Sequence, residues 1–508
     1  MAVYPVRFVF GLAVWGGLVL LTTSCWWDAV KRPASPHEAG EDQSNQLHIV
    51  INSMGLSFPE GFDENNNPYL DYIEKHTGLE IMVTLPPLEG YTDKLNLIMS
   101  SGQLPDMINT SDTALFANYV KQNLLMPLDD YLEEYGPELK RLIPEEAWSQ
   151  VRVDGKIYAV PSLNEVQGTE LIYARKDWLD RLQLDIPTTL EEYVDVMRAF
   201  AEQDPDGNGL DDTFGLSVTE NLGRTAPFFG AFGTQKDAWY ERDGVLVYSG
   251  ILPETRQALE FLSRLYKEGL LDPQFPLNKQ RNLEDKVIDG RVGLYSAAWF
   301  DTRNPIEKNV RQDPQAQWIP LPYPVGPGGH SGTYSTSLVR TYNIVPAAST
   351  NPAGVIRLLN FIAGEGQLTL KLGFENEVWS MDNGRMVSDF QEHNRQQYRG
   401  IYGALADVIN PEIGKARLDS LGEHFRLWDN IQMIHQHLIR NQFEAAPTPA
   451  MGKYNAKLRK MQDETFIKIV VGTYPLDKFD EFVEWWRAEG GDEITAEVNE
   501  WYRAKVEE

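Results

Sequence analysis

The sequence predicts an α/β protein of two lobes, with a hinge between them and a cleft beside the hinge. The chain has 508 residues, more than one hydrophobic core usually serves. Strand-like and helix-like segments alternate from residue 47 to residue 112, which predicts a mostly parallel sheet covered by helices. Residues 155–179 hold two short β-type runs separated by Pro161, Asn164 and Gly168, which favours an extended connector between lobes over a hairpin.

Composition narrows the class of protein. The formal net charge is -28, from 74 acidic and 46 basic side chains, which argues against a nucleic-acid partner because phosphates require a basic surface. The single cysteine excludes an internal disulfide. The 30 prolines and 40 glycines follow no period, so they indicate loops between elements and no linear repeat.

The N-terminus has the layout of an export signal. Arg7 precedes an apolar run from Phe8 to Leu21, which is shorter than the roughly 20 residues that span a bilayer. The following Thr-Thr-Ser-Cys25 resembles the bacterial lipoprotein processing site, which implies that residues 1–24 are a cleaved signal peptide and that Cys25 carries lipid. Thr22 stands where that pattern has an aliphatic residue, so an uncleaved anchor is the alternative. Residues 25–46 are polar and predict a tether.

The first lobe begins with regular strand and helix signals. We expect a strand at 47–51, a helix opened by Pro68 and ended by Gly78, a strand at 79–85, a helix at 91–101 and a strand at 105–109. Ligands of open sheets bind outside the carboxyl ends of the strands, so the loops at 53–63 and 110–112 are candidates. Asp154-Gly155 predicts a two-residue hairpin turn.

The second lobe begins with a helix after Pro187, where Thr188 and Glu191 have the spacing of a capping box. We then expect a strand at 214–219, a strand at 245–248 and a helix at 253–268. Residues 283–301 predict a helix followed by a strand, which places Trp299 at a strand end where it can face the cleft.

The stretch Asp204-Pro-Asp-Gly-Asn-Gly-Leu-Asp-Asp212 predicts a structural calcium site. Calcium takes six to eight oxygen ligands from a tight loop, and the glycines permit the required turn. The candidate ligands are Asp204, Asp206, Asn208, Leu210 through its carbonyl, and Asp212. The stretch matches the first half of an EF-hand loop, but Gly215 occupies the position of the bidentate glutamate. An ordinary Asp/Asn/Gly-rich turn is the alternative.

The sequence shows no recognisable catalytic motif. His435 and His437 are two apart on an expected helix and make a poor metal pair. Gly329-His-Ser-Gly332 has its second glycine one residue too early for a nucleophile elbow, and no phosphate loop or zinc-protease motif occurs. The many acidic residues leave a glycosidase-type carboxylate pair open.

Four pieces, in their order along the chain, carry a resemblance to a known family. They are the lipoprotein leader, Ile157-Tyr-Ala-Val-Pro161, Asp289-Gly-Arg-Val-Gly-Leu294 with Ala298-Trp-Phe300, and Trp318-Ile-Pro-Leu-Pro322. This order resembles the family-1 extracellular solute-binding proteins of ABC importers, which are mostly carbohydrate binders. The resemblance implies a two-lobed periplasmic-binding-protein-like fold and no enzymatic activity. The acidic loop is similar to that of the larger oligosaccharide-binding and alginate-binding members, although Asp212-Thr213 replaces their Asp-Glu pair, so that water or Asp211 would supply one ligand.

The resemblance also implies how the chain divides. Crossings between lobes map onto 160–164, 319–322 and 373–379. Lobe one would hold residues 47–163 and 321–372, and lobe two residues 164–320 and 373–508.

The expected function is that of a monomeric, lipid-anchored receptor at the outer face of the cell membrane, which delivers an oligosaccharide to ABC permease subunits. The resemblance implies aromatic platforms for sugar faces, with polar groups for the hydroxyls. The candidate ligand-binding residues are Asp112, Asn164, Glu165, Glu220, Trp299, Asp301, Tyr334 and Trp379. Two other functions stay open: a surface enzyme that acts on polysaccharide, and a receptor that presents its ligand to a signalling partner.

Overall fold

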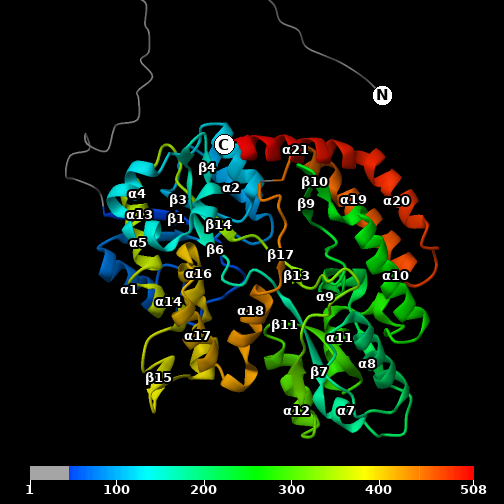
Figure 1. The fold of residues 1–508 in the computed structure, drawn as a ribbon. Coiled ribbons are helices and arrows are strands. Elements are labelled where there is room, and N and C mark those ends of the chain that lie inside the picture. Colours follow the sequence, from blue (N-terminus) through cyan, green and yellow to red (C-terminus); the bar gives the residue numbers. More distant parts are fainter. Residues whose placement is uncertain (1–44, 446, 508) are drawn as a thin grey trace, which may run out of the picture. The chain divides into compact units, whose positions relative to one another are not determined.

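The computed structural model describes residues 45–445 and 447–507. The predicted signal peptide, Cys25 and most of the tether lie outside these residues. Figure 1 shows how the elements of these described residues are arranged.

The strands are β1 (Gln46–Val50), β2 (Glu80–Thr84), β3 (Met107–Thr110), β4 (Arg152–Val153), β5 (Lys156–Ile157), β6 (Ala159–Leu163), β7 (Glu170–Arg175), β8 (Phe214–Ser217), β9 (Trp239–Arg242), β10 (Val245–Tyr248), β11 (Val292–Ala298), β12 (Trp318–Pro320), β13 (Thr333–Tyr334), β14 (Val339–Ile344), β15 (Trp379–Asp382), β16 (Arg385–Ser388) and β17 (Leu438–Ile439).

The α-helices are α1 (Pro68–Thr77), α2 (Tyr91–Ser100), α3 (Thr113–Lys121), α4 (Asp129–Tyr135), α5 (Pro137–Leu142), α6 (Glu145–Ser149), α7 (Lys176–Arg181), α8 (Leu190–Glu202), α9 (Ala226–Gly230), α10 (Pro253–Lys267), α11 (Gln280–Ile288), α12 (Glu307–Gln312), α13 (Pro352–Ala363), α14 (Gln367–Leu372), α15 (Phe390–Arg395), α16 (Gly400–Gly403), α17 (Pro411–Ser420), α18 (Leu427–His435), α19 (Pro449–Val470), α20 (Lys478–Trp486) and α21 (Asp492–Glu507).

A five-stranded sheet organises the first half of the molecule. Its order is β2-β1-β3-β14-β6, with β1 parallel to β2 and β3 and with β14 antiparallel to β3 and β6. The sheet is therefore mixed, whereas the sequence predicted a mostly parallel one, because β14 returns from far along the chain. Helix α13 packs against α1, α4 and α5 beside this sheet (Figure 1). One hydrophobic core joins these elements.

A four-stranded sheet of order β12-β7-β11-β8 organises the second half. Strand β11 is antiparallel to β7 and parallel to β8. A separate hydrophobic core joins α8, α10 and the C-terminal helices to this sheet, and it buries Phe479, Phe482, Trp486, Ile494 and Val498. These aromatic and aliphatic residues of the last two helices therefore pack in this core.

Two extended segments run between the sheets and are hydrogen-bonded to each other. The backbone N–H of Asn164 donates to the carbonyl of Leu338 (2.8 Å), and that of Thr336 donates to the carbonyl of Gln167 (2.7 Å). The Asn164 side chain adds a bond to the Thr336 hydroxyl (2.9 Å). We call residues 164–169 the first crossing and residues 335–338 the second crossing.

Both crossings lie later than the sequence placed them. Residues 160–163 still pair with β14 in the first sheet as part of β6. Residues 319–322 still belong to the second sheet, because β12 pairs with β7 and the N–H of Leu321 donates to Ile172. Tyr398, Tyr402 and Leu405 pack in the first core, although the sequence assigned 373–508 to the second lobe. The proposed division into lobes stays a prediction, with these segments moved accordingly.

Sequence signals that involve a few adjacent residues predicted the structure more accurately than those that depend on long-range contacts. Asp154-Gly155 forms the predicted hairpin between β4 and β5, with φ of 50° and 75°. The cap of α8 lies one residue later than predicted, because Thr189 pairs with Glu192 in the capping box and Thr188 also donates to the Glu192 carboxylate.

Asn67 provides a test of the first core. Its Oδ1 caps α1 by accepting from the N–H groups of Tyr69 and Leu70, and its Nδ2 donates to the Asp63 carbonyl and the Tyr402 hydroxyl. Because the side chain is buried, Asn67→Ala removes a cap and leaves buried groups unpaired, which should lower the free energy of unfolding by about 2–3 kcal/mol.

The matched control is Asp389→Ala, which removes an exposed cap of α15 and should cost about 1 kcal/mol. Chemical denaturation of both variants measures the difference. Equal losses would show that the buried contacts of Asn67 add nothing to the cap.

Candidate ligand-binding cavity

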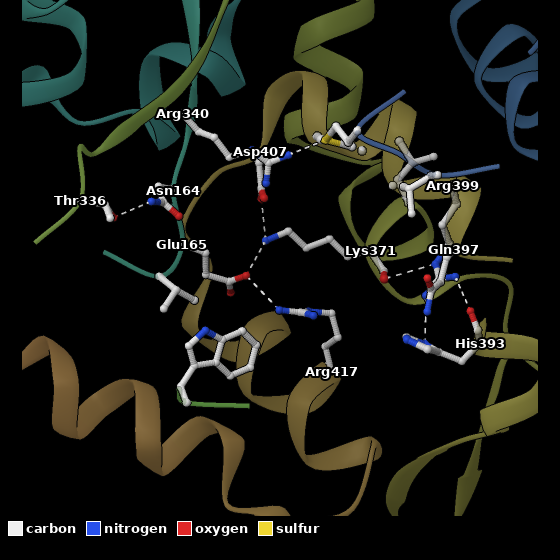
Figure 2. A pocket seen from close by; sticks show the side chains of 18 of the residues that line it. Asn164, Glu165, Thr336, Arg340, Lys371, His393, Gln397, Arg399, Asp407 and Arg417 are labelled. Carbon is white, nitrogen blue, oxygen red and sulfur yellow. Dashed lines mark hydrogen bonds and ion pairs between the residues drawn. The ribbon is translucent and has the colours of Figure 1, made fainter. Parts of the chain in front are cut away.

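A cavity of about 690 Å³ opens beside the first crossing, between the two sheets. Figure 2 shows most of the side chains that line it. From the first half come residues that follow β1 together with parts of β14, α14 and α16, and from the second half comes Trp299 after β11. The polar and charged lining residues are Asn164, Glu165, Thr169, Thr336, Arg340, Lys371, His393, Gln397, Arg399, Asp407 and Arg417.

Lys371 holds together two carboxylates of the cavity wall. Its Nζ lies 2.8 Å from Asp407 Oδ1 and 3.5 Å from Glu165 Oε2, so it joins the first crossing to α14 (Figure 2). All three side chains are largely shielded from water, with exposures of 9%, 16% and 12% for Lys371, Asp407 and Glu165. Such charges are tolerated only when they are paired, so the bridge fixes the position of Glu165.

Arg417 reaches the same carboxylate from α17. Its Nη2 lies 3.1 Å from Glu165 Oε2. Its Nε and the Glu165 Oε1 are both buried without a hydrogen-bond partner. A donor and an acceptor are thus available at the cavity wall for a polar ligand.

Arg399 and His393 form a second polar group. The Arg399 Nη2 donates to His393 Nδ1 (3.1 Å), and its Nη1 donates to the carbonyls of Gln396 (2.7 Å) and His393 (3.3 Å). Burial, and then the charges of Arg399, Arg303 and Arg417, lower the pKa of His393 to about 4. His393 is therefore neutral at physiological pH.

Trp299 provides an aromatic face, and its position follows from the sheet. Strand β11 ends at Ala298, and the Trp299 backbone donates to the carbonyl of Thr169 (3.0 Å) and accepts from the Asn430 side chain (2.8 Å). The half-buried indole also meets Phe300 edge to face, with ring centroids 5.3 Å apart. Such a fixed aromatic face is suited to stacking on a ligand ring.

The structure brings three of the eight predicted ligand-binding residues to this cavity, namely Asn164, Glu165 and Trp299. Two others have local structural roles. Asp112 caps α3 by accepting from Leu115 and also accepts from the Thr92 hydroxyl. Glu220 forms an ion pair with Lys279.

Two further predicted residues are buried away from the cavity. The Asp301 carboxylate accepts from the Ala298 N–H (2.8 Å) and the Tyr295 hydroxyl (2.5 Å), and burial raises its pKa. Trp379 is only 8% exposed, and its indole N–H donates to the Gly373 carbonyl. A residue type suited to sugar binding therefore does not identify a site residue without its surroundings.

Tyr334 lines a second cavity of about 320 Å³ instead. This cavity also holds Glu170, Arg224 and Lys236. Burial raises the pKa of Glu170 and lowers that of Lys236. Lys236 donates to the carbonyls of Asn221 and Leu222, so these charged groups are partly satisfied by the protein itself.

Sequence reasoning missed most of the charged lining. Lys371, Arg399 and Arg417 lie on three separate elements more than 200 residues after the first crossing, and no local motif marks them. The family crossings placed 373–379 near the cleft, but Lys371 lies just before this range and Arg399 and Arg417 lie well after it.

The acidic loop brings its carboxylates together around Asn208. The Asn208 Nδ2 donates to Asp206 Oδ2 (2.8 Å) and Asp212 Oδ1 (3.3 Å), and its backbone N–H donates to Asp204 Oδ1 (3.1 Å). Burial, and then contact with Asp204 and Asp212, raise the pKa of Asp206. Three carboxylates thus converge on the side-chain and backbone N–H groups of Asn208, which is where a cation would be expected to relieve their repulsion.

The geometry of this loop is nonetheless not that of a preformed metal shell. The Asn208 Oδ1 accepts from the Leu210 N–H (2.6 Å), so the amide oxygen is turned away from the carboxylates. Across residues 45–445 and 447–507, no group of three or more His, Cys, Asp or Glu side chains has the geometry to hold a metal ion. The donor set fits calcium only if the Asn208 amide turns.

Within the same described residues, no helix is both long enough and apolar enough to cross a membrane.

Comparison with known proteins gives relatives along almost the whole chain. Lipoprotein LipO of Bacillus subtilis strain 168 is 26% identical over 495 residues, covering 92% of this chain and 95% of the relative. The polygalacturonan/rhamnogalacturonan-binding protein YtcQ of the same organism is 25% identical over 446 residues, covering 85% and 87%.

Solved structures share the fold at low sequence identity. The Streptococcus pneumoniae ABC-transporter substrate-binding protein FusA in complex with kestose has a TM-score of 0.67 and 19% identity, covering 91% of this chain and all of that one. Its EF-hand mutant in complex with fructo-nystose has a TM-score of 0.66, and alginate-binding protein AlgQ2 without calcium ion has 0.64; both are 19% identical with the same coverage. These likenesses confirm the predicted two-lobed periplasmic-binding-protein-like fold with a hinge and an interlobe cleft.

The family model for bacterial extracellular solute-binding proteins matches residues 52–368, which is more than half of the chain. The match runs from the loop after β1 to the start of α14, so it includes strands of both sheets and both crossings. The chain accordingly belongs to the bacterial extracellular solute-binding proteins.

Proposed function

We propose that this protein is the lipid-anchored solute receptor of an ABC importer and that it captures an oligosaccharide in the cavity beside the first crossing. The size and the lining of this cavity are the main support for the proposal. Its volume of about 690 Å³ lies within the range of roughly 300–1,000 Å³ that is typical of small-molecule sites. It combines the aromatic face of Trp299 with amide, hydroxyl and charged groups, which suits the apolar faces and hydroxyl edges of sugars.

Movement at the hinge would couple ligand binding to transport. A ligand that touches both halves of the molecule stabilises the closed form, because only a difference in affinity between two forms shifts their equilibrium. Residues from both halves line the cavity, which supports such a coupling. The permease subunits would then recognise the closed form. No bond of the sugar is made or broken in this proposal.

Similar proteins support a carbohydrate as the ligand. YtcQ is described as a binder of polygalacturonan and rhamnogalacturonan, and FusA is seen in complex with kestose. The proposed lipid anchor at Cys25 is supported by the leader sequence and by the similarity to lipoprotein LipO.

Calcium in the acidic loop is proposed as a structural cofactor. The convergence of Asp204, Asp206 and Asp212 supports it, as do the left-handed glycines Gly207 (φ 74°) and Gly209 (φ 77°). Bound calcium would neutralise these carboxylates and hold the loop between α8 and β8.

Trp299 is the most direct test of the binding proposal. Removing its ring in Trp299→Ala should weaken binding of an oligosaccharide by about 10- to 100-fold, because a stacking face and its buried area are lost. Titration calorimetry with a panel of oligosaccharides measures this change. Trp485→Ala is the matched control, since Trp485 lies on α20 with half its surface exposed and does not line the cavity. Full affinity in Trp299→Ala would rule the indole out as the platform.

The same titrations distinguish a receptor from an enzyme. A receptor leaves the ligand unchanged, so new reducing ends after incubation with pure protein would contradict the transport proposal and favour the polysaccharide-active alternative.

Calcium binding is tested by chelation. Removing the ion should lower the melting temperature by a few degrees, because a ligand that binds only the folded state stabilises it. The Asp204→Asn/Asp206→Asn double variant should melt at the lower temperature with or without chelator. An identical melting curve of the unaltered protein before and after chelation would count against the site.

Lipid attachment is tested in cells. Cys25→Ser should shift the protein from a detergent-requiring to a freely soluble fraction if lipid on the sulfur holds it at the membrane. A variant that stays with the membrane would instead indicate an uncleaved signal anchor.

A further inference from the structure

The cavity carries the opposite charge to the chain that surrounds it. The chain has a formal net charge of -28, yet the cavity is lined by four cationic side chains and only two carboxylates. The cations are Arg340, Lys371, Arg399 and Arg417, and the carboxylates are Glu165 and Asp407. A local excess of positive charge in so acidic a protein requires a reason, since the average composition would place carboxylates there.

Both carboxylates are already committed to Lys371 and Arg417. Lys371 lies between Asp407 and Glu165, and Arg417 meets the same oxygen of Glu165. Two positive charges are then balanced by two negative ones within this group. The remaining arginines of the cavity, Arg399 and Arg340, have no carboxylate of the wall left to pair with them.

Arg399 is the clearest case of an unbalanced charge. The residue is 4% exposed, and its guanidinium donates to carbonyl oxygens and to His393, all of which are neutral acceptors. In the part of the chain that the structure describes, it forms no ion pair with a carboxylate. Burial and the charge of Arg417 lower its pKa. A buried cation without a counter-charge is costly, and an anion bound nearby would offset that cost.

Arg340 and Arg417 offer direct contacts. The Arg340 side chain is exposed, and within residues 45–445 and 447–507 its guanidinium donates only to the sulfur of Met54 (2.9 Å), a weak acceptor that an anion would readily replace. The Arg417 Nε is buried and unpartnered. An arginine with a free N–H in a water-poor wall is well suited to a carboxylate or sulfate oxygen, because such charge-assisted hydrogen bonds are short and strong.

The surroundings of His393 show the same excess of positive charge. Its imidazole lies among Arg399, Arg303 and Arg417, and apart from burial these three charges are what lowers its pKa to about 4. Figure 2 shows His393, Gln397 and Arg399 grouped together along the wall, with Arg417 directed toward Glu165. The unbalanced positive charge is therefore a property of this side of the cavity and not of one side chain.

We infer that the cavity selects a negatively charged oligosaccharide, whose carboxylate or sulfate group is bound by Arg417 with Arg399 supplying uncompensated charge behind it. This inference rests on the proposed function and specifies the class of its ligand. Trp299 then stacks on a sugar ring while the arginines select for the acidic substituent, so that the two features divide the recognition between shape and charge.

The decisive comparison uses the unaltered protein with an acidic oligosaccharide, its uncharged ester and a sulfated oligosaccharide. Trigalacturonate, its fully methyl-esterified form and a sulfated galacto-oligosaccharide are titrated calorimetrically at low and moderate salt. The acid should bind at least about tenfold more tightly than the ester, and its affinity should fall as salt is raised. Tight binding of the sulfated sugar alone would assign the site to sulfate esters instead of uronates, and would still support an anionic ligand.

The outcomes separate this inference from the proposed function. Binding of neutral oligosaccharides with no preference for the acid over its ester overturns the inference and leaves the receptor function intact. Binding of no sugar in a broad panel of neutral and acidic oligosaccharides overturns both.

A variant pair locates the anion. Arg417→Gln should reduce affinity for the preferred acidic ligand about tenfold more than it reduces affinity for a neutral sugar. Arg385→Gln is the matched control, because Arg385 is a largely exposed arginine of β16 that pairs with Glu423 and does not line the cavity. Equal losses for charged and neutral ligands in Arg417→Gln would show a role in shape only, and a loss in Arg385→Gln of the same size would show non-specific electrostatics. Either result overturns the assignment.

Discussion

The ionic bridge of Lys371 is the interaction on which the cavity depends. Lys371 comes from α14 and meets both Asp407 and Glu165, so one ammonium group ties the first crossing to two later parts of the chain. Since none of these groups is well exposed, removing any one of them would leave a shielded charge without its partner. The bridge thereby sets where Glu165 stands, how Arg417 is oriented by it, and which cations of the wall remain unbalanced.

Local chemistry along the sequence was a good guide to elements and a poor guide to neighbours. Pro68 and Gly78 bound α1 as expected, and Asp154-Gly155 forms its hairpin, because each depends on backbone preferences of a few adjacent residues. The mixed character of the first sheet was missed, since it depends on β14 joining β3 from more than 200 residues away. The placement of 319–322 failed for a related reason: a strand-like segment beside a crossing can pair with either sheet, and β12 pairs with β7.

The same distinction explains the candidate site. Asn164, Glu165 and Trp299 were found because a crossing and a strand end are recognisable in sequence and lie beside the cleft in this topology. Trp379 was chosen on residue type, but Val378 and Leu372 enclose it and its indole N–H is used by Gly373. Arg399 could not be predicted as a cavity residue from the sequence. Among the described residues Arg399 has no acidic partner, and that property exists only once the chain is folded.

The paired crossings constrain how the two halves of this protein can move. Residues 164–169 and 335–338 are joined by backbone hydrogen bonds and by the Asn164 side chain, so they act as one two-stranded strap. Twisting one segment against the other would break these bonds, whereas bending both together would keep them. Relative motion of the two halves is therefore restricted to one hinge-bending mode. Because the paired segments already restrict the other motions before a ligand binds, binding costs less conformational entropy.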